Sequence, residues 1–236
     1  MLVPSANTVC EPDMYGMAPM GVTVHAARLL MSTASQSDYL SQEKIEETEN
    51  EIVEQVEKAA RELSTAKVDV VAFCTTAGSF YKGLSWDNEI IERIEKESGV
   101  PATTTSTAMV EALKRLKISR VAVCHPYVKL MGERLKAFLE GHGVNVVNVV
   151  GLGLTSGIAK QTPETIYGLA KRADGPDANG IFISCTNFPA IELIEKLEAD
   201  VGKPVITANQ ATLWALLEKV GIHEAIEGFG KLLKEP

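Results

Sequence analysis

Two apolar runs that each end in Cys-Thr constrain the fold of this chain more than any other feature. The first lies within Val68–Gly83 (VDVVAFCTTAGSFYKG) and the second within Gly180–Pro189 (GIFISCTNFP). Uninterrupted apolar runs of this kind predict strands that are buried on both faces, as in a parallel sheet. In an open α/β sheet, ligands bind beside the carboxyl ends of the strands. Cys74 and Cys185 stand at two such ends, so we predict that they mark one binding site.

Strand-like and helix-like segments alternate along the rest of the chain, which predicts parallel sheets with helices on both faces. The predicted strands lie in Leu2–Thr8, Val22–Leu30, Val70–Cys74, the segment that begins at Pro101, Arg120–Cys124, Val144–Val150, Gly180–Pro189 and Val205–Ala208. The predicted helices are Ile45–Leu63, Asn88–Glu97, Ser106–Leu116, Leu130–Gly141, Pro163–Ala173, Ala190–Val201 and Ala211–Val220. The Glu-rich face of Ile45–Leu63 is expected to be solvated, with Ser41 as the N-cap of this helix. The preceding Ser32–Ser41 is expected to be a mobile loop, and whether it closes over a site is left open.

The order of these segments repeats once along the chain. After each cysteine come a helix, a Gly-x-Pro turn, a short strand and a second helix. This repeat predicts an α/β fold of two pseudo-symmetric, Rossmann-like lobes with parallel sheets and an active site in the cleft between them. Because the helix after each Gly-x-Pro strand can cross over, we expect residues 1–105 and 210–236 to form the N-terminal lobe and residues 106–209 the C-terminal lobe.

The repeat also places polar side chains on both sides of the expected cleft. Asn7 follows the first strand of one half and Tyr127 follows the corresponding strand of the other, although each also fits a purely structural role in its turn. A cysteine beside the unpaired N–H groups of a helix start has a lowered pKa, which favours the reactive thiolate. We predict that Cys74 and Cys185 are catalytic and that the substrate is bound by Asn7, Thr75, Thr76, Tyr127, Thr186 and Asn187.

Other reactive side chains have simpler structural interpretations. Cys10 and Cys124 are expected to be small core residues, because a buried cysteine is more often a packing group than a nucleophile. His25 and His125 have no cysteine or carboxylate partner at a readable spacing and are also expected to be structural. Several methionines flank the first turn, where they favour a packing, lid or subunit-contact surface.

Charge and cysteine content exclude several classes of function. The formal net charge of −8 disfavours binding to nucleic acid and to anionic membranes. Four cysteines and four histidines, with no C-x-x-C pair, predict neither a disulfide framework nor a metal site. The chain has no signal peptide and no apolar run of membrane-spanning length, so we expect a cytoplasmic protein. Only Leu2 and Val3 precede Pro4, so either the first strand is very short or the true start lies upstream.

Several short motifs resemble one branch of the aspartate/glutamate racemase superfamily. The motifs that resemble maleate cis-trans isomerases are PSANT (Pro4–Thr8), CTTAGSFYKG (Cys74–Gly83), PYV (Pro126–Val128), SCTN (Ser184–Asn187) and NQA (Asn209–Ala211). Arylmalonate decarboxylases share the SFY-x-G and TST-A features at Ser79–Gly83 and Thr105–Ala108, but they generally have glycine at the position of Cys74. One departure is the loop around Ser156-Gly157, where the isomerases are expected to have an asparagine and this chain has none.

The resemblance implies an enzyme that needs no cofactor and acts on a small dicarboxylate. In maleate cis-trans isomerisation, Cys74 would add to the double bond as a thiolate, and Cys185 would supply and recover a proton. The resemblance also leaves open an amino-acid or hydantoin-type racemase and an arylmalonate-type decarboxylase, in which cysteines transfer protons. A binding protein that has lost activity is a third interpretation, which the retention of both cysteines disfavours. Relatives with this fold are commonly dimers, so a homodimer or a higher homo-oligomer is expected.

Overall fold

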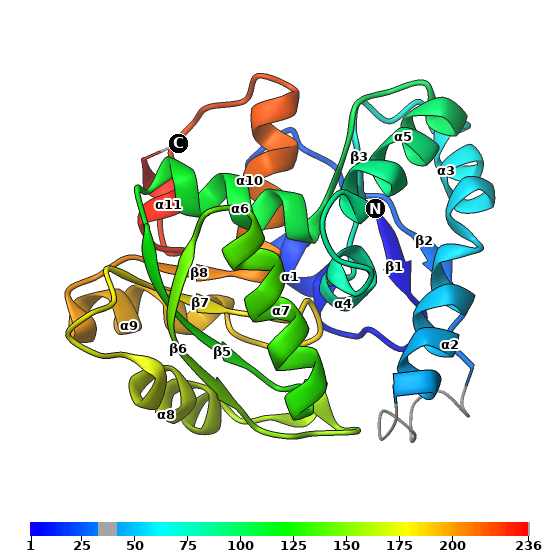
Figure 1. Ribbon diagram of the computed structural model, residues 1–236. Coiled ribbons are helices and arrows are strands. Elements are labelled where there is room, and N and C mark those ends of the chain that lie inside the picture. Colours follow the sequence, from blue (N-terminus) through cyan, green and yellow to red (C-terminus); the bar gives the residue numbers. More distant parts are fainter. Residues whose placement is uncertain (33–41, 236) are drawn as a thin grey trace.

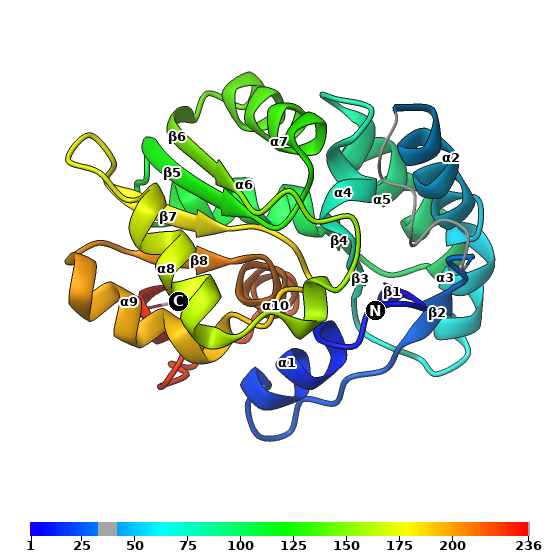
Figure 2. The ribbon, with the colours of Figure 1, turned by 90° about the horizontal axis from the view of Figure 1, so that it is seen from below.

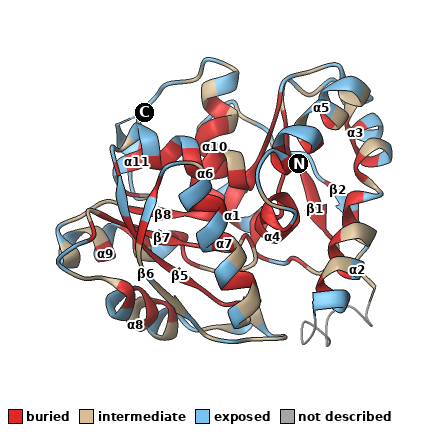
Figure 3. Ribbon diagram, in the orientation of Figure 1, coloured by how far each residue is buried: buried red, intermediate tan, exposed pale blue. Residues whose placement is uncertain are grey.

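The computed structural model describes residues 1–32 and 42–235 of the chain (Figure 1). The expected loop at residues 32–41, apart from Ser32, and the expected N-cap Ser41 lie outside these described residues. Two separate parallel sheets form the centres of two lobes, and most strand residues are buried, except in the edge strand that spans Asn145–Gly151 (Figure 3). No helix in the described part of the chain is both long enough and apolar enough to cross a membrane.

The first sheet contains the strands of the N-terminal part of the chain. Its strands are β1 (Leu2–Pro4), β2 (Ala27–Leu29), β3 (Val71–Phe73) and β4 (Ala102–Thr104). All pair in parallel, in the order β2-β1-β3-β4. Because the strands are parallel, the chain leaves β1 and β3 at the same edge of the sheet, and these two exits hold the first two predicted site segments.

The second sheet repeats this arrangement with the remaining strands. They are β5 (Arg120–His125), β6 (Asn145–Gly151), β7 (Gly180–Ile183) and β8 (Val205–Thr207), in the order β6-β5-β7-β8. Each strand therefore has a counterpart in the first sheet, with β5 equivalent to β1 and β7 equivalent to β3. This equivalence confirms the predicted α/β fold of two pseudo-symmetric lobes with parallel sheets.

Helices cover both faces of each sheet, and the two lobes lie side by side in both views (Figures 1 and 2). The α-helices are α1 (Cys10–Met17), α2 (Gln42–Val53), α3 (Val56–Ser64), α4 (Thr76–Phe80), α5 (Trp86–Ser98), α6 (Thr105–Arg115), α7 (Lys129–Gly141), α8 (Pro163–Ala173), α9 (Ile194–Val201), α10 (Ala208–Lys219) and α11 (Lys231–Lys234). Short 3₁₀ turns are formed by η2 (Ile158–Lys160) and η3 (Ile191–Leu193).

Two equivalent helices, α6 and α10, pack against each other where the lobes meet. Each begins directly after a strand, and a threonine caps each N-terminus: the side chain of Thr104 accepts a hydrogen bond from the Thr107 N–H, and that of Thr207 from the Gln210 N–H. The buried hydroxyl of Thr212 on α10 donates to that of Thr105 on α6 at 3.1 Å. Helix α10 also contacts β4 and α1 of the first half. The boundaries expected for the two lobes stay a prediction.

The single helix expected over Ile45–Leu63 is wrong, because the structure has two helices, α2 and α3, separated at Glu54 and Gln55. The side chain of Gln55 forms two hydrogen bonds to the backbone of Leu30, directly after β2, at 2.7 and 2.8 Å. Gln55 thus extends the hydrogen bonding of the first sheet while its own N–H bonds only to the Ile52 carbonyl, three residues back. This tertiary contact accompanies the break in the helix.

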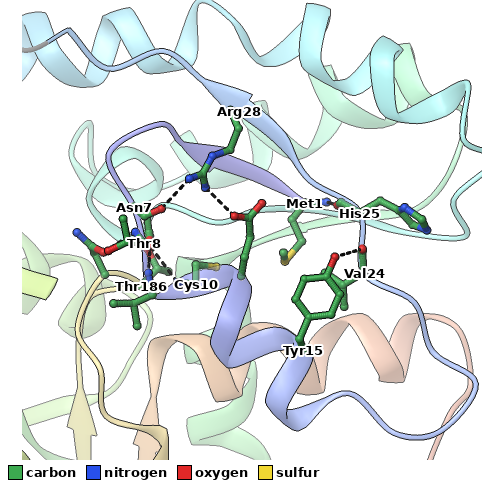
Figure 4. Close-up of polar contacts among 12 residues, drawn as sticks. Met1, Asn7, Thr8, Cys10, Tyr15, Val24, His25, Arg28 and Thr186 are labelled. Carbon is green, nitrogen blue, oxygen red and sulfur yellow. Dashed lines mark hydrogen bonds and ion pairs between the residues drawn. The ribbon is translucent and has the colours of Figure 1, made fainter.

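Two further expected elements are shorter than predicted. Of Val22–Leu30, only β2 pairs with β1, and the residues before it belong to no strand. There the Tyr15 hydroxyl donates to the Val24 carbonyl at 2.8 Å, so a side chain satisfies the backbone (Figure 4). The expected helix Ala190–Val201 begins as the 3₁₀ turn η3 before it continues as α9.

Candidate active site

A pocket of about 520 Å³ lies at the carboxyl ends of β1, β3, β5 and β7, where the two lobes face each other. Seven of the eight predicted site residues line it, namely Asn7, Thr75, Thr76, Tyr127, Cys185, Thr186 and Asn187. The segment that joins β6 to α8 closes one side of the pocket and runs to the middle of the molecule (Figure 2). The predicted cleft between the lobes is therefore present, and both halves contribute to it.

Cys74 is the predicted site residue that does not line the pocket. It follows β3 directly and is fully buried, and its Sγ lies 3.7 Å from the Ala72 carbonyl oxygen, toward which it donates. Its neighbour Thr75 lines the pocket and caps α4 by accepting a hydrogen bond from the Gly78 N–H at 3.3 Å. The Cys74 thiol thus lies one residue behind the pocket wall.

The side chain of Cys10, at the start of α1, meets that of Cys74 in the core. The Cys10 thiol donates a hydrogen bond to the Cys74 sulfur, and this contact lowers the pKa of Cys74, although burial opposes the shift. The same contact, together with burial, raises the pKa of Cys10 well above its usual range. Cys10 is a buried residue, as expected, but it is also a partner of Cys74, which the expectation of a purely structural role missed.

Cys185 lines the pocket from the turn after β7, and its environment has the opposite effect on its thiol. Burial raises the pKa of Cys185 to about 11, although the Asn187 N–H and the Tyr127 hydroxyl stabilise the thiolate. The charge of Glu49 adds to this increase in the pKa. The backbone of Cys185 has a φ of +98°, in the left-handed region that non-glycine residues rarely adopt, and such conformations cluster at functional sites.

Thr186 connects the two cysteine turns across the cleft. Its Oγ1 donates to the Cys74 carbonyl at 3.1 Å. The same Oγ1 accepts from the Asn7 side-chain amide at 3.0 Å (Figure 4). A second bond crosses between the lobes nearby, from the Thr8 N–H to the Asn187 side-chain oxygen at 3.1 Å. Asn7, Thr186 and Asn187 therefore line the pocket and also hold the two lobes in register.

Asn7 is itself fixed by contacts on both sides. Its side-chain oxygen accepts the N–H groups of Val9 and Cys10, at 3.0 and 2.9 Å, where the chain enters α1. Its carbonyl accepts a hydrogen bond at 3.0 Å from Arg28, which also pairs with Glu11 at 3.1 Å (Figure 4). The stabilising role in a turn that the sequence allowed for Asn7 is therefore present.

Tyr127 reaches the pocket from the exit of β5, and its ring stacks on His125 with the ring centroids 5.5 Å apart. The imidazole of His125 occupies the space over Gly132 and Gly151, where an added Cβ at either glycine would overlap the ring. Burial lowers the pKa of His125 to about 4, so the imidazole is neutral at pH 7. The structure therefore gives His125 a packing role beneath Tyr127, as the sequence suggested.

A further set of buried polar groups supports the Cys185 turn from below. The Asn209 side-chain amide donates to the Asp13 carboxyl at 2.7 Å and to the Thr186 carbonyl at 3.0 Å. Burial raises the pKa of Asp13 to about 7, the Asn209 hydrogen bond opposes this shift, and the charge of Glu192 adds to it. The NQA motif, which contains Asn209, thus lies behind the site and does not line the pocket.

Sequence reasoning missed two charged residues in the pocket wall, Glu49 and Lys160, which are the charged side chains among its described lining residues. The expectation that the Glu-rich face of Ile45–Leu63 is solvated is wrong for Glu49, which is 1% exposed. Glu49 follows Ile45 by four positions and precedes Ile52 by three, so helical spacing places it on the apolar stripe and could have identified it. No comparable pattern identifies Lys160, on η2.

The arrangement supports chemistry that uses two thiols whose pKa values are shifted in opposite directions. Cys74 has a lowered pKa and Cys185 a raised one, and they lie on equivalent turns of the two lobes beside one pocket. Pairs of titratable groups whose pKa values are driven apart are typical of acid–base and nucleophilic catalysis. Within residues 1–32 and 42–235, no group of three or more His, Cys, Asp or Glu side chains is arranged to hold a metal ion.

The sequence and the fold both match known enzymes. A sequence profile of the arylmalonate decarboxylase family matches residues 1–233. The chain is 26% identical to the maleate isomerase of Pseudomonas putida over 247 residues, which cover 98% of this chain and 95% of that protein. It is 31% identical to the arylmalonate decarboxylase of Bordetella bronchiseptica over 189 residues, 78% of this chain and 79% of that one.

The crystal structure of the maleate isomerase Iso from Pseudomonas putida S16 superposes with a TM-score of 0.90. The superposition covers 99% of this chain and 96% of that one, at 25% identity. Profile, sequence and fold thus agree along nearly the whole chain. The chain is therefore an enzyme of the arylmalonate decarboxylase family, in the branch that it shares with the maleate isomerases.

Proposed function

We propose that the enzyme catalyses the cis-trans isomerisation of maleate, or of a close cis-dicarboxylate, to fumarate without a cofactor. The observation that carries this proposal is the pair of cysteines at equivalent turns, one with a lowered and one with a raised pKa. A nucleophile must be present as a thiolate, whereas a proton donor must hold its proton at neutral pH. Maleate isomerases that align over 98% or more of this chain support the choice of substrate.

In the first half of the reaction, the Cys74 thiolate adds to C2 of maleate, so that a C–S bond forms and the double bond becomes single. The electron pair moves to C3, where the Cys185 thiol supplies a proton and becomes a thiolate itself. Hydrogen bonds from the Asn187 N–H and the Tyr127 hydroxyl stabilise that thiolate, and the same two contacts oppose the raised pKa of Cys185 in the free enzyme. The product of this half is a succinyl thioether of Cys74.

In the second half, the single bond between C2 and C3 rotates. The Cys185 thiolate then removes a proton from C3, the new double bond forms, and the C–S bond to Cys74 breaks to release fumarate. Both cysteines return to their starting protonation states, so the cycle consumes no proton and no electron. Cys10, which donates to the Cys74 sulfur, stabilises the thiolate before addition and after elimination.

The buried position of Cys74 adds one requirement to this mechanism. In the structure, its Sγ lies 3.7 Å from the Ala72 carbonyl oxygen, and Cys74 is not among the residues that line the pocket, whereas Thr75 and Thr76 are. Attack therefore needs a rotation of the Cys74 side chain about its Cα–Cβ bond, toward the pocket. Such a rotation is a common thermal motion of a side chain, and bound substrate would favour the rotated state.

Proton NMR of the purified protein with maleate tests the proposal. Fumarate should accumulate with the wild-type protein and not with Cys74→Ala. The matched control is Cys124→Ala, because Cys124 is fully buried in β5, does not line the pocket, and has a pKa that burial raises to about 12. If the wild-type protein leaves maleate unchanged, the assignment of this substrate is wrong.

One observation favours a second function, the decarboxylation of an arylmalonate. Cys185 lines the pocket and carries a protonated thiol, whereas Cys74 lies behind the wall. Protonation of a planar carbanion after loss of CO₂ needs only the first of these groups. The same NMR tubes charged with phenylmalonate in D₂O distinguish the two functions: a decarboxylase would release phenylacetate with deuterium at Cα, and would still do so after Cys74→Ala.

A further inference from the structure

The proposed mechanism requires that two carboxylates enter a pocket whose wall is largely neutral. Its hydrogen-bond donors at the cysteine turns are amides and hydroxyls, and the remaining lining is mostly apolar. Two charged side chains stand among the described lining residues, Glu49 from α2 and Lys160 from η2. Neutral donors can bind a carboxylate at either end of the pocket. The charges of Glu49 and Lys160 therefore determine at which end the second carboxylate of the substrate lies.

Glu49 disfavours a carboxylate at its end of the pocket. Its carboxyl is buried against α4, with Oε2 3.0 Å from the position that a Cβ on Gly78 would occupy. Its charge acts on Cys185 and on Tyr81, since it raises the pKa of both. A substrate carboxylate near Glu49 would meet the same repulsion.

Lys160 provides the opposite charge. It ends η2, whose start is fixed by Gly157 at a φ of +70° and by the hydrogen bond from the Lys160 N–H to the Gly157 carbonyl at 3.1 Å. Its side chain forms no hydrogen bond or ion pair with any other residue that the structure describes. Lys160 is exposed and is one of the residues that line the pocket. A lysine in this position, without a protein carboxylate as its partner in the described part of the chain, attracts an anionic group of a ligand.

We propose that Lys160 binds the second carboxylate of the substrate and thereby selects dianions over monoanions of the same shape. This inference rests on the proposed isomerisation, and it assigns a specificity role that neither cysteine turn can supply. The neutral donors around Asn7 and Thr75 then hold the other carboxylate, beside the carbon that Cys74 attacks. Lys160 is a specificity residue and takes no part in bond making or breaking.

Steady-state kinetics with maleate and with its monoamide, maleamate, test this role. Lys160→Gln should raise KM for maleate by up to about fivefold at low salt, because it removes one charged contact at an exposed position. Its kcat should stay within about twofold, and KM for maleamate, which carries one carboxylate, should change little. Lys160→Glu should raise KM for maleate further, and Lys160→Arg should restore most of the affinity.

The control is Lys58→Gln, which removes the same charge from an exposed position on α3, outside the pocket. Added salt should raise KM for maleate in the wild-type protein more than in Lys160→Gln, since screening removes the same attraction. An unchanged KM in both Lys160→Gln and Lys160→Glu overturns the inference and leaves the proposed reaction intact.

Calorimetric binding separates the two failures when the wild-type protein does not turn over maleate. If the wild-type protein binds maleate and Lys160→Gln binds it more weakly, the inference about Lys160 stands and the proposed reaction is wrong. If maleate does not bind, or binds equally to the wild-type protein and to Lys160→Gln, both the inference about Lys160 and the proposed reaction are wrong.

Discussion

The turn after β3 and the turn after β7 occupy equivalent places in the two sheets, yet they treat their cysteines in opposite ways. At the first turn, a thiol partner from α1 lowers the pKa of a fully buried Cys74. At the second, burial and the charge of Glu49 raise the pKa of Cys185, which contacts the pocket directly. The backbone differs too, because Cys185 has a φ of +98° and Cys74 shows no such departure.

This comparison shows that the repeated topology determines where the two cysteines lie but does not determine the pKa of either thiol. The two sheets bring both cysteines to one cleft, and the neighbours from other elements then set the protonation state of each thiol. Those neighbours, Cys10 for Cys74 and Glu49 for Cys185, have no counterparts in the repeat. The asymmetry is what a reaction with one nucleophile and one proton donor needs.

The largest expected effect comes from removing each thiol in turn. Cys74→Ala should abolish the isomerisation of maleate, by more than about 1,000-fold in kcat, because no nucleophile remains. Cys185→Ala should lower kcat by about 100-fold or more, which is the usual contribution of a positioned proton donor. Mass spectrometry of Cys185→Ala with maleate should then detect a maleate adduct on Cys74. If the two variants are equally active and neither forms an adduct, the proposed roles of Cys74 as nucleophile and Cys185 as proton donor are wrong.

A smaller effect is expected when the link between the two turns is cut. Thr186→Val keeps the shape of the side chain but removes its bonds to Asn7 and to the Cys74 carbonyl, so kcat should fall about tenfold and the free energy of unfolding by about 1–3 kcal/mol. Thr212→Val is the control, because Thr212 bridges α10 to α6 outside the pocket and should affect unfolding alone. Urea unfolding and kinetics on the same samples make the comparison, and a Thr186→Val enzyme with unchanged kcat would contradict it.

Replacing the partner of Cys74 tests the cause of its lowered pKa. The Cys10 thiol donates to the Cys74 thiolate, so Cys10→Ala should raise the pKa of Cys74 and move the acidic limb of the pH–rate profile to higher pH. At neutral pH the rate should fall by up to about tenfold per unit of the shift. Cys10→Ser retains a donor and should show a smaller displacement. A profile that does not move in Cys10→Ala would show that another group stabilises the thiolate.

The smallest effect on activity is expected at the support beneath the Cys185 turn, where the test is the stability of the protein. Burial raises the pKa of Asp13 from 3.8 to about 7. Between about pH 4 and pH 7, the folded protein therefore keeps a proton on Asp13 that the unfolded chain has already released. The contribution of Asp13 to stability should therefore fall as the pH rises through this window and should stay constant above it. Asp13→Asn does not titrate, so the difference in unfolding free energy between the wild-type protein and this variant should change across the same window. A constant difference from pH 4 to pH 8 would contradict the raised pKa.

Local signals predicted much of the fold. The bounds of α8 are found as predicted, because Thr162 caps the helix and Pro163 fits its first turn. The repeated pattern of strand, cysteine and helix predicted the two sheets, since each half of the chain contains the four strands of one sheet. The same repeat led from sequence to the pocket, where Asn7 and Tyr127 both lie.

Contacts between distant segments could not be predicted in the same way. The break between α2 and α3 accompanies a bond from Gln55 to a strand edge that precedes it by many residues. Cys10, at the start of α1, meets Cys74 only in the folded chain, because 63 residues separate them in the sequence, and nothing local distinguishes Cys10 from Cys124. Lys160 reaches the pocket through the path of the segment between β6 and α8, which no pattern in the sequence specifies.

The most direct test of the central claim is a titration of the thiolates by ultraviolet absorbance, which reports on buried thiols without a reagent. The spectrum of the wild-type protein is compared with those of Cys74→Ala and Cys185→Ala across the pH range in which all three stay folded. The account predicts that Cys74→Ala removes the thiolate that forms at the lower pH, whereas Cys185→Ala removes one that appears only at strongly alkaline pH. The reverse order, or two thiols that titrate together, would contradict it.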